Sequence, residues 1–177
     1  MFIDTAEGYG NEGDIGRALR NTPRDDYFIV TKISFKEHMS ENGAKEAVRV
    51  SKEKLGVEVL DLVLVHGVMG ESIGDRRGMW KALQNMEEEG VIRSWGVSNY
   101  EVPLLQSLLQ DSSLHPSIIQ IPFSPFHQGK QLGVDGNKEI SDVVGFCKGK
   151  GIVVMGYGLL SNWPFSAHSG LGLKTSF

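Results

Sequence analysis

Four residues that can hold or move protons stand at, or just beyond, the ends of short apolar runs. Asp4 and Tyr9 follow the first run, Lys32 lies near the end of FIVTKI, and His66 ends LDLVLVH. A carboxylate, a phenol, an ammonium group and an imidazole are side chains that act as general acids and bases and tune one another's protonation. We therefore expect a proton-transfer site if the fold brings these four residues together.

Later apolar runs end in a similar way. Ser98 with Asn99, then Gln120, then Tyr157 stand at the ends of the next three runs. The strands of a TIM barrel are parallel, and its active site is built at their carboxyl ends. The series predicts one site at that end of a parallel sheet.

The elements that must position these residues are short strands that alternate with helices. FIVTKI and LDLVLVH are almost continuously apolar, which is typical of parallel strands covered on both faces. The predicted strands are Phe2–Thr5, Phe28–Ile33, Leu60–His66, Ile92–Ser98, Ile118–Pro122 and Ile152–Tyr157.

Helical patterns fill the intervals between the strands. Ser40 is expected to cap a helix that runs through Lys45–Leu55 and ends at Gly56. The alternation indicates an α/β fold whose parallel strands are joined by helical crossovers. Two other predicted helices span Val102–Leu109 and Ile140–Lys150. A further one contains a stripe of residues expected to face the core: Met79, Trp80, Leu83 and Met86.

Composition narrows the class of protein. The 177 residues suit one domain, and a net charge of −4 without a basic stripe argues against nucleic-acid binding. No apolar stretch is long enough to cross a membrane, and the first residues do not resemble a signal peptide. The one cysteine, Cys147, lies in an apolar helical run, so we expect a buried core thiol and a protein of the reducing cytoplasm.

Five segments, in order, resemble the aldo-keto reductase superfamily: FIDTAEGYGNE, FIVTKI, LDLVLVHG, VIRSWGVSNY and GIVVMGYGLL. The resemblance runs from Phe2 to about Leu160, and five collinear segments are far more specific than any one of them. It implies a (β/α)₈ TIM barrel that uses NADPH, or NADH, to reduce a small aldehyde or ketone to an alcohol.

The resemblance also implies roles for the strand-end residues. Asp4, Tyr9, Lys32 and His66 fall on the catalytic tetrad of the family. Ser98, Asn99 and Gln120 fall on positions that contact the nicotinamide, and Tyr157 on the aromatic residue that stacks against its ring.

These roles agree with the residue types. Carbonyl reduction adds a hydride at carbon and a proton at oxygen, so the site needs a general acid. Lys32 beside Tyr9 would stabilise the phenolate, Asp4 would hold Lys32, and His66 could donate a hydrogen bond to the carbonyl oxygen.

Other readings are open for each residue alone. Asp4 could end a turn, Tyr9 could be a loop aromatic and His66 a core histidine, whereas Lys32 in a buried strand requires a partner such as Asp4. Two further functions are a non-catalytic nucleotide-sensing protein on the same scaffold and an aldolase that forms a Schiff base at Lys32.

Several positions depart from the family pattern. Gly67 and Val68 replace the Trp-Pro that follows the histidine in many members, which leaves the substrate class open. Ile119 replaces an asparagine and predicts a less polar carboxamide site. Ser124 stands at a histidine position, and Gly158 with Leu159 replaces Ser-Pro.

The number of elements departs as well. The chain provides about six β/α units, and the first and last strands of an eight-stranded barrel are expected to be missing. We interpret residues 1–160 as a partial barrel and residues 161–177 as a loop-like tail, with the sequence a fragment that has little activity by itself.

Overall fold

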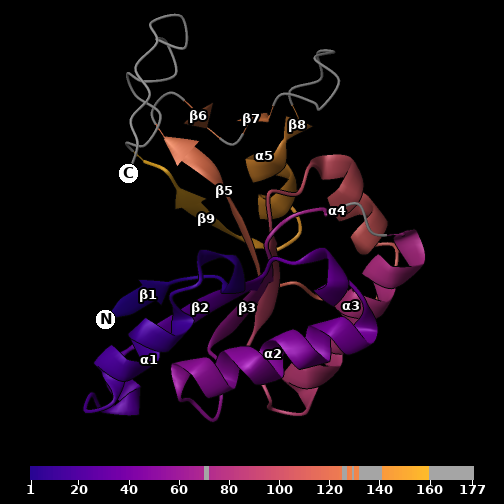
Figure 1. Cartoon of the computed structure of the whole chain (residues 1–177). Coiled ribbons are helices and arrows are strands. Elements are labelled where there is room, and N and C mark those ends of the chain that lie inside the picture. The colour runs from indigo at the N-terminus through magenta and orange to yellow at the C-terminus, as the bar shows by residue number, and fades with distance from the viewer. Residues whose placement is uncertain (70–71, 125–126, 129, 132–140, 160–177) are drawn as a thin grey trace, which may run out of the picture.

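The computed structural model describes residues 1–69, 72–124, 127–128, 130–131 and 141–159. Within them, six parallel strands form one curved sheet, a half-barrel, in the order β1-β2-β3-β4-β5-β9 (Figure 1). The strands are β1 (Phe2–Asp4), β2 (Phe28–Ile33), β3 (Leu62–Val65), β4 (Trp95–Ser98), β5 (Ile118–Ser124) and β9 (Val153–Tyr157). The predicted α/β class and partial barrel are confirmed.

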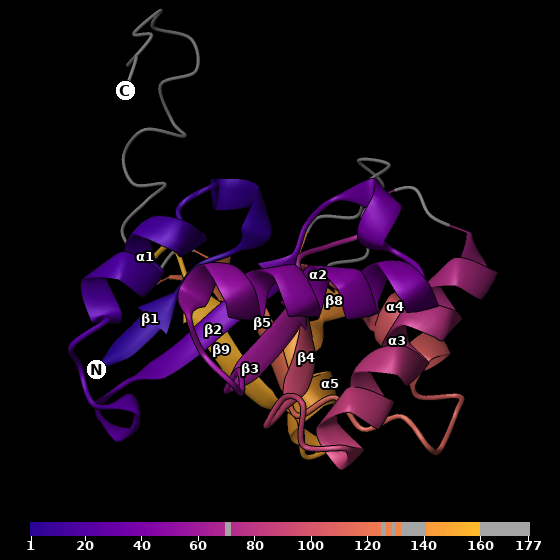
Figure 2. The ribbon, with the colours of Figure 1, turned by 60° about the horizontal axis from the view of Figure 1, so that its bottom comes forward.

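Five α-helices connect and cover the strands in the described residues. Figure 2 shows α2 crossing over β2 and β3, with α1 on the side of β1 and α3 on the side of β4. No helix among the described residues is long and apolar enough to cross a membrane. The helices are α1 (Glu12–Leu19), α2 (Glu41–Leu55), α3 (Ile73–Glu88), α4 (Val102–Leu108) and α5 (Val143–Lys148).

Short elements complete the described chain. Two 3₁₀ turns, η1 (Glu7–Tyr9) and η3 (Lys36–His38), follow β1 and β2 and border the carboxyl end of the sheet, while η2 (Arg24–Asp26) precedes β2. The remaining strands are β6 (His127–Gln128), antiparallel to β5, and the antiparallel pair β7 (Lys130–Gln131) and β8 (Ser141–Asp142).

The predicted start and end of α2 are confirmed, whereas several other predicted bounds differ from the structure. Ser40 caps α2 by accepting a hydrogen bond from the Gly43 amide at 3.1 Å, and Gly56 ends it in the left-handed region at φ 69°. Helix α1 was not predicted, since its short sequence EGDIGRAL contains two glycines, which lower the helix propensity. The predicted strands at 60–66 and 92–98 are shorter, because Leu60 and Ile92 form only an isolated bridge. The expected tail at 161–177 lies outside the described residues.

Side chains on the strands alternate between two faces, as the pleat requires. On β2, Ile29 and Ile33 pack into the core beneath the helices, whereas Val30 and Lys32 point to the opposite, inner face. On β3, Val63 and Val65 belong to the outer core, and Leu62 and Leu64 to a small inner cluster with Val30. The inner face therefore carries apolar residues at earlier positions of the strands and polar residues at their carboxyl ends.

The outer core confirms two further expectations. Met79, Trp80, Leu83 and Met86 of α3 are all buried in it. Cys147 is fully buried as well, and burial raises the pKa of its thiol to about 11. A thiol that remains protonated at neutral pH is a core residue rather than a nucleophile.

The close approach of β4 and β5 requires a glycine at position 96. A Cβ on Gly96 would lie 2.1 Å from the carbonyl oxygen of Ile118 and 3.0 Å from Cδ2 of Leu64. We expect Gly96→Ala to lower the free energy of unfolding by about 3 kcal/mol, because the strands would have to separate. Urea denaturation measures the change.

Gly74→Ala in the first turn of α3 is the matched control, because its nearest neighbour would be Ser72 Oγ at 3.8 Å. We expect it to change stability by less than about 1 kcal/mol, and to increase it if anything. An equal effect of the two substitutions would contradict the packing argument.

Candidate active site

The ammonium group of Lys32 is buried on the inner face of the sheet. The residue is 2% exposed, and Nζ forms an ion pair with Oδ1 of Asp4 and donates a hydrogen bond to the carbonyl oxygen of Thr5 at 3.0 Å. A buried ammonium is costly unless it is paired and hydrogen-bonded. The expectation that Asp4 is the partner of Lys32 is confirmed.

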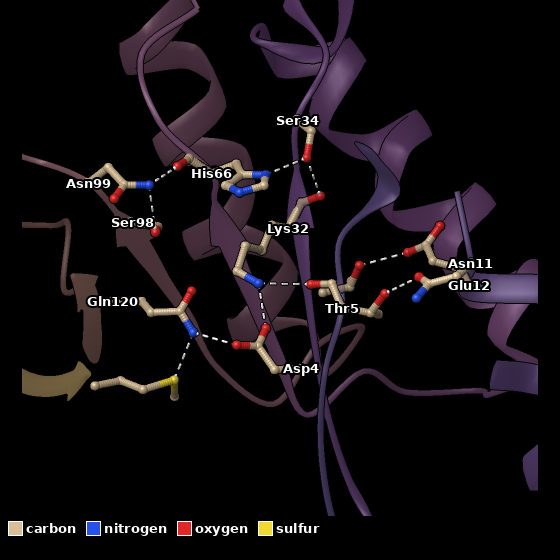
Figure 3. A network of polar contacts seen from close by, with 12 residues as sticks. Asp4, Thr5, Asn11, Glu12, Lys32, Ser34, His66, Ser98, Asn99 and Gln120 are labelled. Carbon is tan, nitrogen blue, oxygen red and sulfur yellow. Dashed lines mark hydrogen bonds and ion pairs between the residues drawn. The ribbon is translucent and has the colours of Figure 1, made fainter. Parts of the chain in front are cut away.

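The second oxygen of Asp4 reaches across the half-barrel. Oδ2 accepts a hydrogen bond from Nε2 of Gln120 at 2.7 Å, and the same nitrogen lies 3.1 Å from Sδ of Met155 (Figure 3). An ionised carboxylate only accepts, so the amide nitrogen of Gln120 must face it. Three residues from β1, β2 and β5 thus form one chain of charge-assisted hydrogen bonds.

Tyr9 lies between this buried charge and solvent. It belongs to η1, and its ring centroid is 5.2 Å from Nζ of Lys32. The same ring meets the ring of His66 edge-on at 5.6 Å. Tyr9 is 53% exposed, so a molecule arriving from solvent can reach it. The structure brings together all four residues predicted to transfer protons.

His66 follows the carboxyl end of β3 and is half-buried. Its Nδ1 lies 2.7 Å from Oγ of Ser34. Burial, and then the positive charge of Lys32, lower the pKa of the imidazole below its ordinary 6.5, against smaller opposing effects of Asp4 and Glu7. The imidazole is therefore neutral at pH 7.

Three of the four residues predicted to contact a cofactor, Ser98, Asn99 and Tyr157, form a second cluster, whereas Gln120 belongs to the first. Nδ2 of Asn99 donates to the carbonyl oxygen of His66 at 2.9 Å and to Oγ of Ser98 at 3.1 Å, and its Oδ1 accepts from the Tyr157 hydroxyl at 2.7 Å. Asn99 adopts a left-handed backbone, φ 58°, which asparagine tolerates better than most residues. Burial, and to a lesser degree the nearby Tyr9, raise the pKa of the Tyr157 phenol, so that it remains a donor.

The prediction drawn from Ile119, which replaces an asparagine of the family pattern, is wrong. Ile119 was expected to make the carboxamide site less polar, but it is fully buried in the outer core. The alternation of the strand turns its side chain away from the face that carries Gln120. The side chain of Ser124 lies outside the described part of the structure.

Sequence reasoning missed two polar residues that border the site. Ser34 contacts His66, and the buried carboxylate of Glu7 accepts hydrogen bonds from the backbone amides of Ser34 and Phe35. The available signal was spacing: Ser34 stands two residues after Lys32, the interval that places strand residues on one face. Glu7 gave no such signal, since it lies in a loop-like segment.

The sequence matches a known profile over nearly its whole length. Residues 1–168 match the Aldo/keto reductase family. The chain belongs to the aldo/keto reductase family. Within the described residues, no group of three or more His, Cys, Asp or Glu side chains is placed to hold a metal ion.

Individual relatives agree with the family assignment. The chain is 39% identical over 166 residues to the NAD/NADP-dependent indole-3-acetaldehyde reductase of Schizosaccharomyces pombe, covering 91% of this chain and 54% of that protein. It is 36% identical over 132 residues to the methylglyoxal reductase DkgA of Escherichia coli O157:H7, covering 73% and 46%. The chain thus spans about half the length of the curated relatives it matches.

Solved structures of family members superpose on the half-barrel. An aldo/keto reductase from Brucella melitensis matches with a TM-score of 0.77 and 30% identity, covering 90% of this chain and 58% of the other. The aldo-keto reductase of Bombyx mori in complex with NADP matches with a TM-score of 0.72 and 27% identity, covering 89% and 51%. The six parallel strands are therefore part of the family's barrel.

Removing the charge of Asp4 tests the buried ion pair. We expect Asp4→Asn to lower the free energy of unfolding by about 2 kcal/mol, because the Lys32 ammonium stays buried without its carboxylate. Chemical denaturation at pH 7 measures the change.

Asp14→Asn is the matched control, since Asp14 forms an exposed ion pair with Arg17. We expect a change of less than about 0.5 kcal/mol there. If both substitutions cost the same, the Lys32–Asp4 pair does not support the fold.

His66 should make stability depend on pH. Its lowered pKa in the folded state means that the unfolded chain binds a proton more readily below pH 6.5. Stability should therefore fall as the pH decreases from 6.5 through the folded pKa, and this part of the loss should vanish in His66→Gln. Thermal unfolding at a series of pH values measures it.

The exposed His115 provides the comparison for this experiment. We expect His115→Gln to keep the acid-side loss of the unmodified chain. A His66→Gln profile identical to that of the unmodified chain would contradict the assignment.

Proposed function

We propose that the protein reduces an aldehyde or ketone to an alcohol with NADPH, or NADH, and that Tyr9 is the general acid. One observation carries the proposal: the buried Lys32 ammonium, paired with Asp4, lies 5.2 Å from the Tyr9 ring, which in turn contacts His66. A fixed positive charge beside a solvent-accessible phenol is suited to an acid that must release its proton.

Each residue of the site has a separate role in the proposed reaction. Tyr9 donates its hydroxyl proton to the carbonyl oxygen as that oxygen gains negative charge, and Lys32 stabilises the phenolate left behind. Asp4 holds the Lys32 ammonium in place through their ion pair. His66 orients the carbonyl oxygen by a hydrogen bond. Because Tyr9 is 53% exposed, the phenolate can recover a proton from water after turnover.

The second cluster is suited to hold a nicotinamide. Ser98 and Asn99 offer hydroxyl and amide groups beside His66, and Tyr157 has a ring that is 39% exposed. Gln120 uses its amide nitrogen for Asp4, so it would hold a carboxamide through its oxygen. When bound, the nicotinamide supplies the hydride that is added to the carbonyl carbon.

The relatives support a small carbonyl substrate. Their names specify an indole-3-acetaldehyde reductase, a methylglyoxal reductase and, in Corynebacterium, a 2,5-diketo-D-gluconic acid reductase B at 33% identity. All three named compounds contain an aldehyde or ketone group. We extend to this protein only the shared class, a small aldehyde or ketone.

The environment of Lys32 weighs against the Schiff-base alternative. A lysine nucleophile must lose its proton and meet the substrate carbonyl. Lys32 is 2% exposed, and its Nζ is held by Asp4 and the Thr5 carbonyl group. We expect borohydride trapping with carbonyl compounds to leave Lys32 unmodified, and mass spectrometry of the peptide that contains it checks this.

The substitution Tyr9→Phe tests the proposed acid. In the protein expressed from its full reading frame, we expect turnover of a panel of small aldehydes to fall by about 10²–10⁴-fold, while NADPH binding is retained. Absorbance of NADPH measures turnover, and fluorescence titration measures binding.

Tyr27→Phe, in the core outside the site, should leave both quantities unchanged. An unmodified protein that binds NADPH tightly and reduces none of the aldehydes would favour the nucleotide-sensing alternative. Equal turnover by the Tyr9→Phe variant would exclude Tyr9 as the acid.

A further inference from the structure

Ser34 lies where its hydroxyl group can determine which ring nitrogen of His66 carries the hydrogen. Its Oγ lies 2.7 Å from Nδ1 of His66 and 3.3 Å from the carbonyl oxygen of Lys32 (Figure 3). A serine hydroxyl has one hydrogen to donate. Among the described contacts, either the hydrogen points to Nδ1 of His66, or it points to the Lys32 carbonyl oxygen and Nδ1 of His66 donates to Ser34.

The two distances favour the first arrangement. O–H···O hydrogen bonds are most common at about 2.7–2.8 Å and rarely extend beyond about 3.0 Å. The 3.3 Å contact with the Lys32 carbonyl oxygen falls outside this range, whereas 2.7 Å to Nδ1 of His66 is a good hydrogen-bond distance. The neutral imidazole then accepts at Nδ1 and carries its hydrogen on Nε2.

We propose that Ser34 is a positioning residue that donates its hydroxyl hydrogen to Nδ1 of His66 and so fixes the imidazole as the Nε2–H tautomer. The proposal rests on the function proposed above, in which His66 donates a hydrogen bond to the substrate carbonyl. A neutral imidazole has one donor and one acceptor. In the opposite tautomer, Nε2 would present a lone pair to the carbonyl oxygen and repel it.

The surroundings hold Ser34 in this arrangement. Glu7, 7% exposed, accepts hydrogen bonds from the amide of Ser34, from the amide of Phe35 at 2.8 Å and from Nδ1 of His38 at 2.9 Å. On the other side, a Cβ at Gly8 would lie 3.0 Å from Cβ and 3.1 Å from Oγ of Ser34. The turn that carries Tyr9 therefore also fixes the residue that orients His66.

The charges around His66 agree with a neutral ring. Burial and then the charge of Lys32 oppose protonation and lower the pKa of His66, whereas Asp4 and Glu7 favour protonation more weakly. Both nitrogens of an imidazolium are donors, whichever way the Ser34 hydroxyl group points. Only in the neutral ring does the Ser34 hydroxyl select the tautomer.

The tautomer can be measured without turnover. In protein labelled with ¹⁵N-histidine, long-range ¹H–¹⁵N spectra at pH 7.5 distinguish a protonated nitrogen from an acceptor nitrogen, and His66→Gln identifies the His66 signals. We expect Nε2–H in the unmodified protein, a mixture of tautomers in Ser34→Ala, and a return to Nε2–H in Ser34→Thr. Ser113→Ala, at an exposed serine, should leave the spectrum unchanged.

Two spectral results would overturn the proposal: the Nδ1–H tautomer in the unmodified protein, or an unaltered Nε2–H signal in Ser34→Ala. A turnover measurement adds the catalytic consequence. We expect kcat of Ser34→Ala to fall about 10-fold with NADPH affinity unchanged, and Ser34→Thr to recover most of it. If the unmodified protein reduces no carbonyl compound, the proposed function fails, and the spectra still decide the role of Ser34.

Discussion

The charge of Lys32 inside the half-barrel is the constraint on which the site depends. An ammonium on the inner face must be neutralised and hydrogen-bonded, or the strand that carries it is destabilised. Asp4 and the Thr5 carbonyl group satisfy it from β1, and Gln120 holds the other oxygen of Asp4 from β5. One buried charge thereby links three strands that are far apart in sequence.

The same constraint places the reactive groups. Curvature of the sheet lets Asp4 on β1 meet Gln120 on β5, although β2, β3 and β4 lie between their strands. Tyr9 and His66 then lie at the rim, one beyond β1 and the other beyond β3, with their rings in contact. The charge of Lys32 is protected from water while the phenol of Tyr9 remains accessible, an arrangement suited to the general-acid role proposed for Tyr9.

Much of this arrangement could be predicted from sequence because strand periodicity is local. The apolar runs located all six parallel strands, and the cost of burying Lys32 indicated Asp4 as its partner. The Asp4–Gln120 bond depends on how strongly the sheet curves, which no local pattern encodes. The role proposed for Ser34 depends on the turn held by Glu7, and placing Ile119 required knowing which strand face carries the candidate site.

A double-mutant cycle on Asp4 and Lys32 tests the central claim most directly. Lys32→Met removes the charge while keeping an unbranched side chain of similar size, so Asp4→Asn should cost much less stability in that background than in the unmodified chain. We expect a coupling free energy of at least about 1 kcal/mol from urea denaturation of the four proteins. Additive effects, within about 0.5 kcal/mol, would show that the two residues act independently and would contradict it.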